Sequence, residues 1–336
     1  VSISFAPNND IAWNNNHGET IDPATAAALV AGFQTGVIDA DVMVKTRMST
    51  IDRGDYANVQ MNGKATVQNL KYVAEGLPPV SISSAQADFT PRKVEVPQFD
   101  MQLGKSDLRG SATINNILAY FSPEATMKGD LVVRSSYFNA DEWLTEEEPT
   151  EPASGMVAGT GKEEEELFNR FDFAFDGRVE KLDYDIYQLT GLEATGRFTP
   201  NHLLLTSYKG QIGDSDFAGS GELTNVWNYV FYDEVLGGEI NFRSAFMNLN
   251  QFMTEEPVPA GEEPVATEPI LVPENVSMIV HSQIGKVLYD DMELTDVRGD
   301  LIVADQQVRF DGVKGQLLGG GIEMKGGYDT REPEKP

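Results

Sequence analysis

The sequence predicts a mainly β protein, in which internally repeated antiparallel strands form a curved, groove-like or solenoid-like sheet with a few short helices. Three observations support this fold class. Hydrophobicity alternates with a period of two in many short segments, which is typical of strands with one covered face. Gly, Asn, Asp and Pro separate these segments at short intervals, as hairpins require. The chain also repeats itself at a shift of 109 positions.

The repeat is clearest in two stretches, GKSDLRGSATINN (104–116) and GDSDFAGSGELTN (213–225). Aligning 89–147 with 198–256, without a gap, gives 18 identities in 59 positions. Unrelated sequences of ordinary composition would match at roughly one position in seventeen. A third copy begins at a shift of 105: LDYDIYQLTGL (182–192) resembles VLYDDMELTDV (287–297), and YKGQIG (208–213) resembles VKGQLLGG (313–320).

This repetition predicts an order of segments along the chain. We expect a partial N-terminal unit with a short helix and strand (1–54), β-repeat 1 (55–147), an acidic mobile linker (148–167), β-repeat 2 (168–256), an acidic Pro-rich linker (257–273), a truncated β-repeat 3 (274–330) and a tail (331–336).

Local signals predict the individual elements. DPATAAALVAGF (22–33) predicts a helix with Asp22 as N-cap and Pro23 in its first turn, and IDADVMVKTRMS (38–49) predicts the opening strand of the first copy. NNILAYF (115–121) and NVWNYVF (225–231) predict short helices at equivalent places, as do NADEWL (139–144) and NLNQFM (248–253), each opening on a capping Asn. FDFAFDGRV (171–179), HLLLTSYKG (202–210), GDLVVRSSYF (129–138) and GEINFRSAF (238–246) read as strands.

Two acidic, Pro-rich stretches follow the first two copies. Together, 145–167 and 254–273 hold 13 of the 53 acidic residues, eight in the first and five in the second. Low hydrophobicity and like charge predict mobile segments there. Two interpretations remain open, a docking site for a basic partner and a solvated connection.

Composition excludes several functions. The net charge of −28 opposes binding to nucleic acid or to anionic lipid headgroups. The absence of cysteine excludes a disulfide scaffold and thiolate catalysis. No apolar run approaches the roughly 20 residues that span a bilayer, and the chain begins with Val without a secretory signal. We interpret it as the excised soluble part of something longer.

A search for catalytic motifs predicts a non-enzymatic protein without cofactor or metal. His17, His202 and His281 have no partner at metal-ligand spacing, and no nucleophile elbow, Walker loop or dinucleotide fingerprint is present. Asp107 and Asp216 recur at one place in successive repeats, so we interpret them as capping a hairpin turn flanked by glycines with unusual φ. The predicted turn residues are Gly104, Ser106, Asp107, Gly110, Gly213, Ser215, Asp216 and Gly219.

The order of these motifs resembles the AsmA-like proteins of Gram-negative envelopes, particularly the Bacteroidetes-type members. The resemblance lies in GKSDLRG and GDSDFAG, the following Asn and apolar segment, GDLVVRS and GEINFRS, and the Asn-capped NADEWL and NLNQFM, and it covers roughly 36–330. It implies a β-rich periplasmic body anchored to the inner membrane by a helix that lies outside this sequence. It also implies a hydrophobic groove that carries phospholipid toward the outer membrane, and no catalytic residues.

The functional expectation is therefore the handling or conduction of phospholipid acyl chains for outer-membrane biogenesis. The alternative is a structural or interaction module that spaces an envelope anchor from a protein partner. An apolar trough suffices for acyl chains, because their attraction is proportional to area and is not directional. Whether the apolar face is an open groove or a closed core stays open. The predicted groove-lining residues are Phe171, Phe173, Phe175, Leu203 and Leu205.

Overall fold

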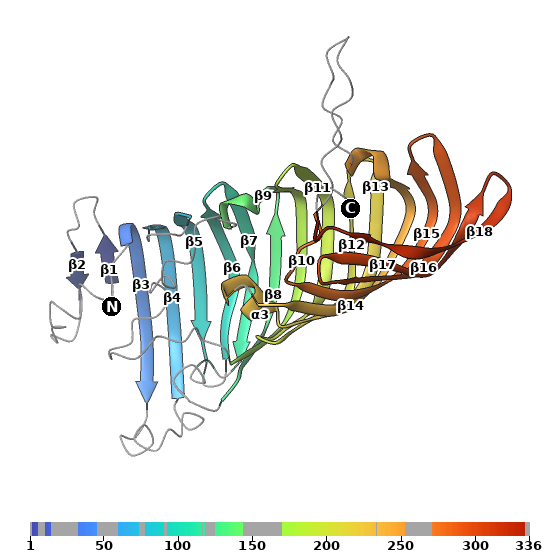
Figure 1. Ribbon diagram of the computed structural model, residues 1–336. Helices are drawn as coiled ribbons and strands as arrows, with labels where there is room; N and C mark the ends of the chain where they lie inside the picture. Colours follow the sequence, from blue (N-terminus) through green and yellow to red (C-terminus); the bar gives the residue numbers. More distant parts are fainter. Residues whose placement is uncertain are drawn as a thin grey trace, which may run out of the picture. The chain divides into compact units, whose positions relative to one another are not determined.

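The computed structural model confirms a mainly β protein with very little helix (Figure 1). It describes residues 2–5, 11–14, 33–45, 60–73, 78–90, 93–115, 117, 125–143, 170–232, 234–252 and 271–332. The predicted helix at 22–33 lies outside these residues except for Phe33, which begins a strand, and most of the predicted helix at 115–121 and nearly all of the two acidic stretches also lie outside them. The chain forms two compact units, residues 1–187 and 188–336, so their boundary falls inside the predicted β-repeat 2.

Unit 1 contains one mixed sheet. Its elements are β1 (Ser2–Phe5), β2 (Ile11–Asn14), β3 (Phe33–Lys45), β4 (Gln60–Tyr72), β5 (Val80–Phe89), β6 (Lys93–Leu103), β7 (Ser106–Asn115), β8 (Met127–Ser135), β9 (Phe138–Asn139), the 3₁₀-helix η3 (Asp141–Trp143) and β10 (Phe171–Tyr184). Consecutive strands from β3 to β8 pair antiparallel, and β1 pairs antiparallel with both β2 and β3. β10 then pairs parallel with β8 and β9.

Unit 2 follows the same plan. Its elements are β11 (Tyr187–Phe198), β12 (His202–Ile212), β13 (Ser215–Thr224), α3 (Val226–Tyr232), β14 (Leu236–Asn248), the 3₁₀-helix η4 (Leu249–Phe252), β15 (Val276–Tyr289), β16 (Met292–Ala304), β17 (Gln307–Leu317) and β18 (Gly320–Asp329). Strands β11 to β14 pair antiparallel, β14 and β15 pair parallel, and β15 to β18 pair antiparallel again. Neither sheet closes on itself among the described residues.

The two parallel pairs mark the joints between repeats. Parallel neighbours cannot be joined by a tight hairpin, because the chain must return to the same end of the sheet. The two acidic stretches occupy these places in the sequence, between η3 and β10 and between η4 and β15. The last residues of the second stretch are described, and Val272 is buried there, with its N–H donating to Thr330 Oγ1 at 3.0 Å.

Two-residue turns join six of the antiparallel pairs, whereas the longer turn between β11 and β12, residues 199–201, has no positive φ. In the six two-residue turns the first central residue has a φ between 52° and 56°, which such a hairpin turn requires and which Gly, Asp and Asn adopt most easily. This residue is Gly104 or Gly213 in the two repeated stretches and Asp185, Asp290 or Asp305 in three other hairpins. Leu318, between β17 and β18, has a φ of 52° and is the exception in residue type.

The predicted helices are short where they are described. NVWNYVF forms α3, which begins after Asn225, whose carbonyl accepts the Tyr229 N–H at 3.0 Å. NADEWL and NLNQFM form the single 3₁₀ turns η3 and η4 rather than α-helix. In each the Asn side-chain oxygen accepts the N–H two residues later, Asn139 from Asp141 and Asn248 from Asn250.

Candidate functional site: an apolar sheet face and a repeated polar joint

Each unit presents one sheet face that is apolar from strand to strand. Residues directly paired in neighbouring strands point to the same side of a sheet. In unit 2 one such row crosses β12 to β18 and contains only apolar residues or glycine: Leu205, Gly221, Ile240, Val280, Leu301, Phe310 and Gly326. In unit 1 a comparable row crosses β3 to β8 and reaches β10: Val42, Gly63, Phe89, Val94, Ile114, Gly129 and Phe173. We call the faces that contain these rows the apolar faces of the two units.

The apolar faces are not a fully buried core. Most members of the two rows are half-buried, and Val94, at 3% exposed, is the buried hydrophobic residue among them. Across the described residues, the buried hydrophobic side chains are Leu70, Val94, Phe171, Val272, Val287, Val297 and Val313. Val287, Val297 and Val313 pack together in unit 2, where Met247, Ile284, Leu294, Leu301 and Phe310 contact them.

The structure places all five predicted groove residues on these faces. Phe171, Phe173 and Phe175 lie on the apolar face of unit 1, with the rings of Phe171 and Phe173 6.4 Å apart between centroids. Phe171 is 8% exposed, while the other two are half-buried. Leu203 and Leu205 lie on the apolar face of unit 2, and Leu204 between them points to the opposite face, where it is 45% exposed.

The opposite faces are charged and carry cross-strand ion pairs. Lys64–Asp88 and Arg134–Asp176 are examples in unit 1, at 3.4 and 2.8 Å. In unit 2, His281 lies between two carboxylates, with Nδ1 2.8 Å from Asp300 Oδ1 and Nε2 3.0 Å from Glu239 Oε1. The hydrogen bonds to the carboxylates, that to Asp300 first and then that to Glu239, raise the pKa of His281. Because these side chains are partly exposed, each pair contributes little to stability.

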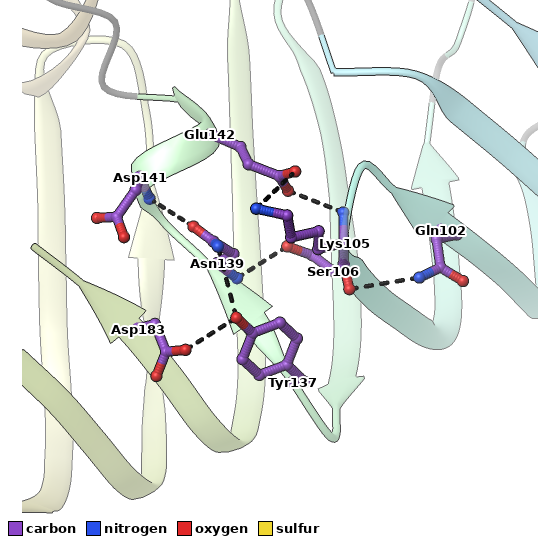
Figure 2. A network of polar contacts seen from close by, with 8 residues as sticks. All are labelled: Gln102, Lys105, Ser106, Tyr137, Asn139, Asp141, Glu142 and Asp183. Carbon is purple, nitrogen blue, oxygen red and sulfur yellow. Dashed lines mark hydrogen bonds and ion pairs between the residues drawn. The ribbon is translucent and has the colours of Figure 1, made fainter.

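A cluster of hydrogen bonds from backbone N–H groups to side chains recurs at the start of β7 and of β13 and includes the repeated Ser-Asp pair. We call this cluster the polar joint. In unit 1, the Asp107 carboxylate accepts the N–H groups of Ser136 and Tyr137, at 2.9 and 2.7 Å. Ser106 Oγ, which is fully buried, accepts the Asn139 N–H at 2.9 Å. Figure 2 shows the part of this network around Ser106 and Asn139, in which the Tyr137 hydroxyl also donates to Asp183 of β10 at 2.8 Å.

The same contacts recur in unit 2 between residues that lie 109 positions further along the chain. Asp216 accepts the N–H groups of Ala245 and Phe246, at 3.0 and 2.8 Å, and Ser215 Oγ accepts that of Asn248 at 2.9 Å. In both polar joints the N–H of the second central turn residue also donates a hydrogen bond to a side chain of the 3₁₀ helix. Glu142 accepts from Lys105 at 2.8 Å, and Gln251 accepts from Asp214 at 3.1 Å.

The 3₁₀ helices also hold the next hairpin. Asp141 accepts the Asp185 N–H at 2.6 Å in unit 1, and Asn250 accepts the Asp290 N–H at 2.6 Å in unit 2. Each joint therefore connects a hairpin turn, the end of the strand that closes a repeat, and the first hairpin of the following repeat. Asn139 and Asn248 were predicted only as helix caps, and Glu142 and Gln251 were not predicted at all, although the residues of each pair are 109 positions apart.

The structure corrects two parts of the predicted turn role. Asp107 and Asp216 do not cap their own turns, because their carboxylates bind N–H groups 29 and 30 residues further along the chain. Gly110 and Gly219 lie within β7 and β13, not in turns, and neither has a positive φ. A Cβ at either glycine would collide with a carbonyl of the next strand and with the Phe99 or Tyr208 ring, so close approach requires glycine there.

The contribution of the Asp216 carboxylate to the polar joint can be tested by measuring how the stability of the protein changes at acid pH. Burial raises the pKa of Asp216, but hydrogen bonds from Ala245, Phe246 and Ser244 outweigh burial, and the net pKa is lowered from 3.8. The stabilisation by the Asp216 carboxylate is therefore complete above about pH 4 and is lost as the pH falls through the lowered value. We expect Asp216→Asn to destabilise the protein by about 1–2 kcal/mol at pH 7, because the substitution replaces hydrogen bonds to a charged carboxylate with weaker bonds to a neutral amide.

Urea unfolding at pH 7 and at pH 2–3 would measure this effect. The difference between wild type and Asp216→Asn should shrink in acid, because the wild-type carboxyl becomes neutral. Asp214→Asn is the matched control, with an exposed side chain two residues away, and should change stability by less than about 0.5 kcal/mol at either pH. A pH-independent loss in Asp216→Asn would show that the charge is not what holds the joint.

The described residues contain no cluster of His, Cys, Asp or Glu suited to binding a metal ion. None of the helices in the described part of the chain is long and apolar enough to cross a bilayer. No family model, curated protein or solved structure matches the chain.

Proposed function

We propose that this chain is a non-enzymatic, AsmA-like protein whose apolar faces hold phospholipid acyl chains. The observation that carries the proposal is the continuous apolar row, such as Leu205 to Phe310, whose members stay half-buried across successive strands. An acyl chain needs contact area rather than a specific polar site, and each CH₂ group removed from water contributes about 0.8 kcal/mol. The charged opposite face explains how such a sheet remains soluble on its other side.

The cellular setting in this proposal is the periplasm of a Gram-negative envelope. The resemblance to AsmA-like proteins supports an inner-membrane anchor outside this sequence and a role in outer-membrane biogenesis. In that setting, acyl chains lie along the apolar face while the headgroup remains in water at its edge. The charge of −28 then serves solubility rather than attraction to anionic headgroups.

The polar joints favour one second candidate, a structural module that spaces an envelope anchor from a protein partner without lipid transfer. Ser106 and Ser215 are 0% exposed and bind the strand ends that close the first and second repeats. Buried, fully paired polar groups fix one geometry, which a rigid spacer needs. Such a module would have no requirement for a half-exposed apolar face.

Two variants in one strand distinguish these functions. Leu205→Asp places a carboxylate on the apolar face of unit 2, and Leu204→Asp places the same charge on the opposite face. Wild type should co-purify with phospholipid, detected by native mass spectrometry and lipid extraction. We expect Leu205→Asp to retain about tenfold less lipid, because an acyl chain cannot cover a charge without removing it from water. Leu204→Asp should retain the wild-type amount.

Thermal unfolding of both variants separates lipid loss from unfolding. A half-buried carboxylate on an open face stays hydrated, so Leu205→Asp should remain folded. A folded wild type that carries no phospholipid, or equal lipid in the two variants, would contradict the proposal and favour the spacer. An unfolded Leu205→Asp would indicate a closed core at that position.

A further inference from the structure

A row of histidines and carboxylates crosses unit 2 on the charged face, opposite its apolar face, with one member on each strand from β12 to β17. Glu222 pairs directly with Glu239, and Asp300 pairs directly with Asp311. His281 lies between these two carboxylate pairs, since it contacts Glu239 on one side and Asp300 on the other. We call this set the His–carboxylate row: His202, Glu222, Glu239, His281, Asp300 and Asp311.

Each pair of opposed carboxylates is unfavourable by itself. Residues directly opposite each other in neighbouring strands have Cβ atoms about 5 Å apart, and like charges in such positions destabilise a sheet. His202 reaches the first pair from outside, with Nδ1 2.6 Å from Glu222 Oε1. Of the two histidines in the row, His281 is the one that lies between the pairs, so a charge on its ring offsets both.

The geometry around His281 suits the protonated ring. Its Nδ1 is 2.8 Å from Asp300 Oδ1 and its Nε2 is 3.0 Å from Glu239 Oε1, and both are hydrogen-bond distances. An ionised carboxylate only accepts hydrogen bonds, whereas a neutral imidazole has a single N–H and can donate to only one of the two. Loss of the proton therefore leaves a nitrogen lone pair facing a carboxylate oxygen.

The direction of the pH dependence follows from these contacts. The hydrogen bond to Asp300 first, and then that to Glu239, raise the pKa of His281 above its ordinary value of 6.5, and burial opposes this change only in part. A group whose pKa is raised by folding stabilises the folded protein fully below its unfolded value, and the stabilisation is lost as the pH rises through the raised value. The contacts of His281 are therefore complete below about pH 6.5 and weaken above it.

Two arginines lie on the next row along the strands. Arg243 of β14 and Arg298 of β16 each pair directly with Gln283 of β15. A guanidinium stays charged throughout the range in which a histidine titrates. On β15 itself, the residues that share the charged face with His281 on either side are Ile279 and Gln283, which are neutral. The change of charge near neutral pH therefore falls on the histidines of the row.

His281 lies on the parallel strand pair between the second and third copies. β14, which ends the second copy, pairs parallel with β15, and β15 pairs antiparallel with β16. Parallel pairing is slightly less stable per residue than antiparallel pairing. Because Glu239, His281 and Asp300 come from β14, β15 and β16, their contacts link the last strand of the second copy to the first two strands of the third.

The first parallel pair, between β8 and β10, has a different contact at the same place. Asp176 of β10 has the position of His281 at the shift of 105 residues, and Arg134 Nη1 of β8 lies 2.8 Å from its Oδ1. Because no histidine takes part in that contact, it lacks the proton-dependent element found in unit 2. The β8–β10 pair therefore serves as an internal control for the β14–β15 pair.

We propose that His281 is a pH-sensitive link between the second and third copies, in which the protonated ring holds β14, β15 and β16 together and loss of the proton loosens the β14–β15 pair. At higher pH the row keeps its opposed carboxylates without the cation between them. Since His281 and its partners are partly exposed, the effect is moderate, and we expect local opening of the β14–β15 ladder to become roughly three- to tenfold more frequent. This proposal does not rest on lipid binding.

NMR titration of the full chain measures the protonation of His281 directly. The chain contains three histidines, so the spectrum of His281→Gln assigns the ring signals by their absence. The pKa of His281 should lie above 6.5, and Glu239→Gln and Asp300→Asn should each lower it toward that value. His202→Gln, which changes the other histidine of the row, should lower it far less.

Hydrogen exchange tests whether the proton holds the strands together. After correction for intrinsic exchange rates, the opening constant of the β14 and β15 amides should be roughly three- to tenfold larger at pH 8.5 than at pH 6 in wild type. His281→Gln is neutral at both pH values and should open as wild type does at pH 8.5. His281→Lys is charged at both and should open as wild type does at pH 6. The β8 and β10 amides should show no such change.

Three results would overturn the proposal. The first is a pKa of His281 at or below 6.5, because the folded protein would then not favour the protonated ring. The second is a wild-type opening constant that does not change with pH, or that changes equally in His281→Gln. The third is loss of the pH dependence in His202→Gln, which would assign the effect to the other histidine.

Discussion

Replacing Gly219 with alanine is expected to destabilise unit 2 by about 3 kcal/mol, among the largest effects of any single methyl group in this protein. The added Cβ would collide with the Asn241 carbonyl of β14 and with the Tyr208 ring of β12. The carbonyl belongs to the backbone and cannot move aside like a flexible side chain. The β13–β14 ladder must therefore separate locally.

Thermal unfolding and hydrogen exchange of the β13 and β14 amides would measure this loss. A loss of 3 kcal/mol corresponds to a fall in melting temperature of roughly 6–12 °C for a unit of this size. Gly321→Ala is the matched control, because a Cβ there meets nothing within 4 Å and its φ is not positive. Gly110→Ala should reproduce the effect in unit 1. An unchanged melting temperature for Gly219→Ala would mean that the two strands are less closely packed than described.

Ser215→Val should have an effect of similar size, about 3 kcal/mol. Ser215 is 0% exposed, and its Oγ accepts hydrogen bonds from the Asn248 N–H at 2.9 Å and from Gln251 Nε2 at 2.7 Å. Valine removes the acceptor, leaves buried donors unpaired and adds a methyl group to a filled site. The end of β14 and the 3₁₀ helix η4 should then detach from the turn before β13.

Limited proteolysis near η4, together with urea unfolding, would detect this detachment. Ser207→Val is the control within β12, where Ser207 is exposed and its hydroxyl lies 2.8 Å from that of Thr195. It should change stability by less than about 0.5 kcal/mol, because valine suits an exposed strand position. Equal stability of Ser215→Val and Ser207→Val would contradict a structural role for the joint.

The repeat and the period of two predicted much of the fold. Phe171, Phe173 and Phe175 were predicted to share one strand face, and they do, because side chains alternate sides along any extended strand. The equivalence of Asp107 and Asp216 was likewise visible at a fixed shift, and both bind N–H groups 29 and 30 residues further on. Such features follow from local periodicity and from repetition, which a single sequence displays directly.

Which strands pair with each other, and in which direction, could be determined only from the tertiary structure. The sequence by itself determined which residues alternate, where turns fall and that the same unit recurs, because these depend on neighbours in the chain. It did not show that β8 and β14 pair parallel with the strands that follow, since the hydrophobic pattern of a strand is the same for either direction of pairing. Nor did it show that Gly110 and Gly219 lie under aromatic rings.

The Ser-Asp pair illustrates the same division. Its recurrence was evident from the sequence, but its partners were not. A hydroxyl and a carboxylate beside a turn bind that turn by default, and only the pairing of β7 with β8 and of β13 with β14 brings distant N–H groups within reach. The tertiary structure therefore decided the role of these residues, because hydrogen bonds act over about 3 Å and the chain brings residues 29 to 33 positions apart to that distance only after the sheet has formed.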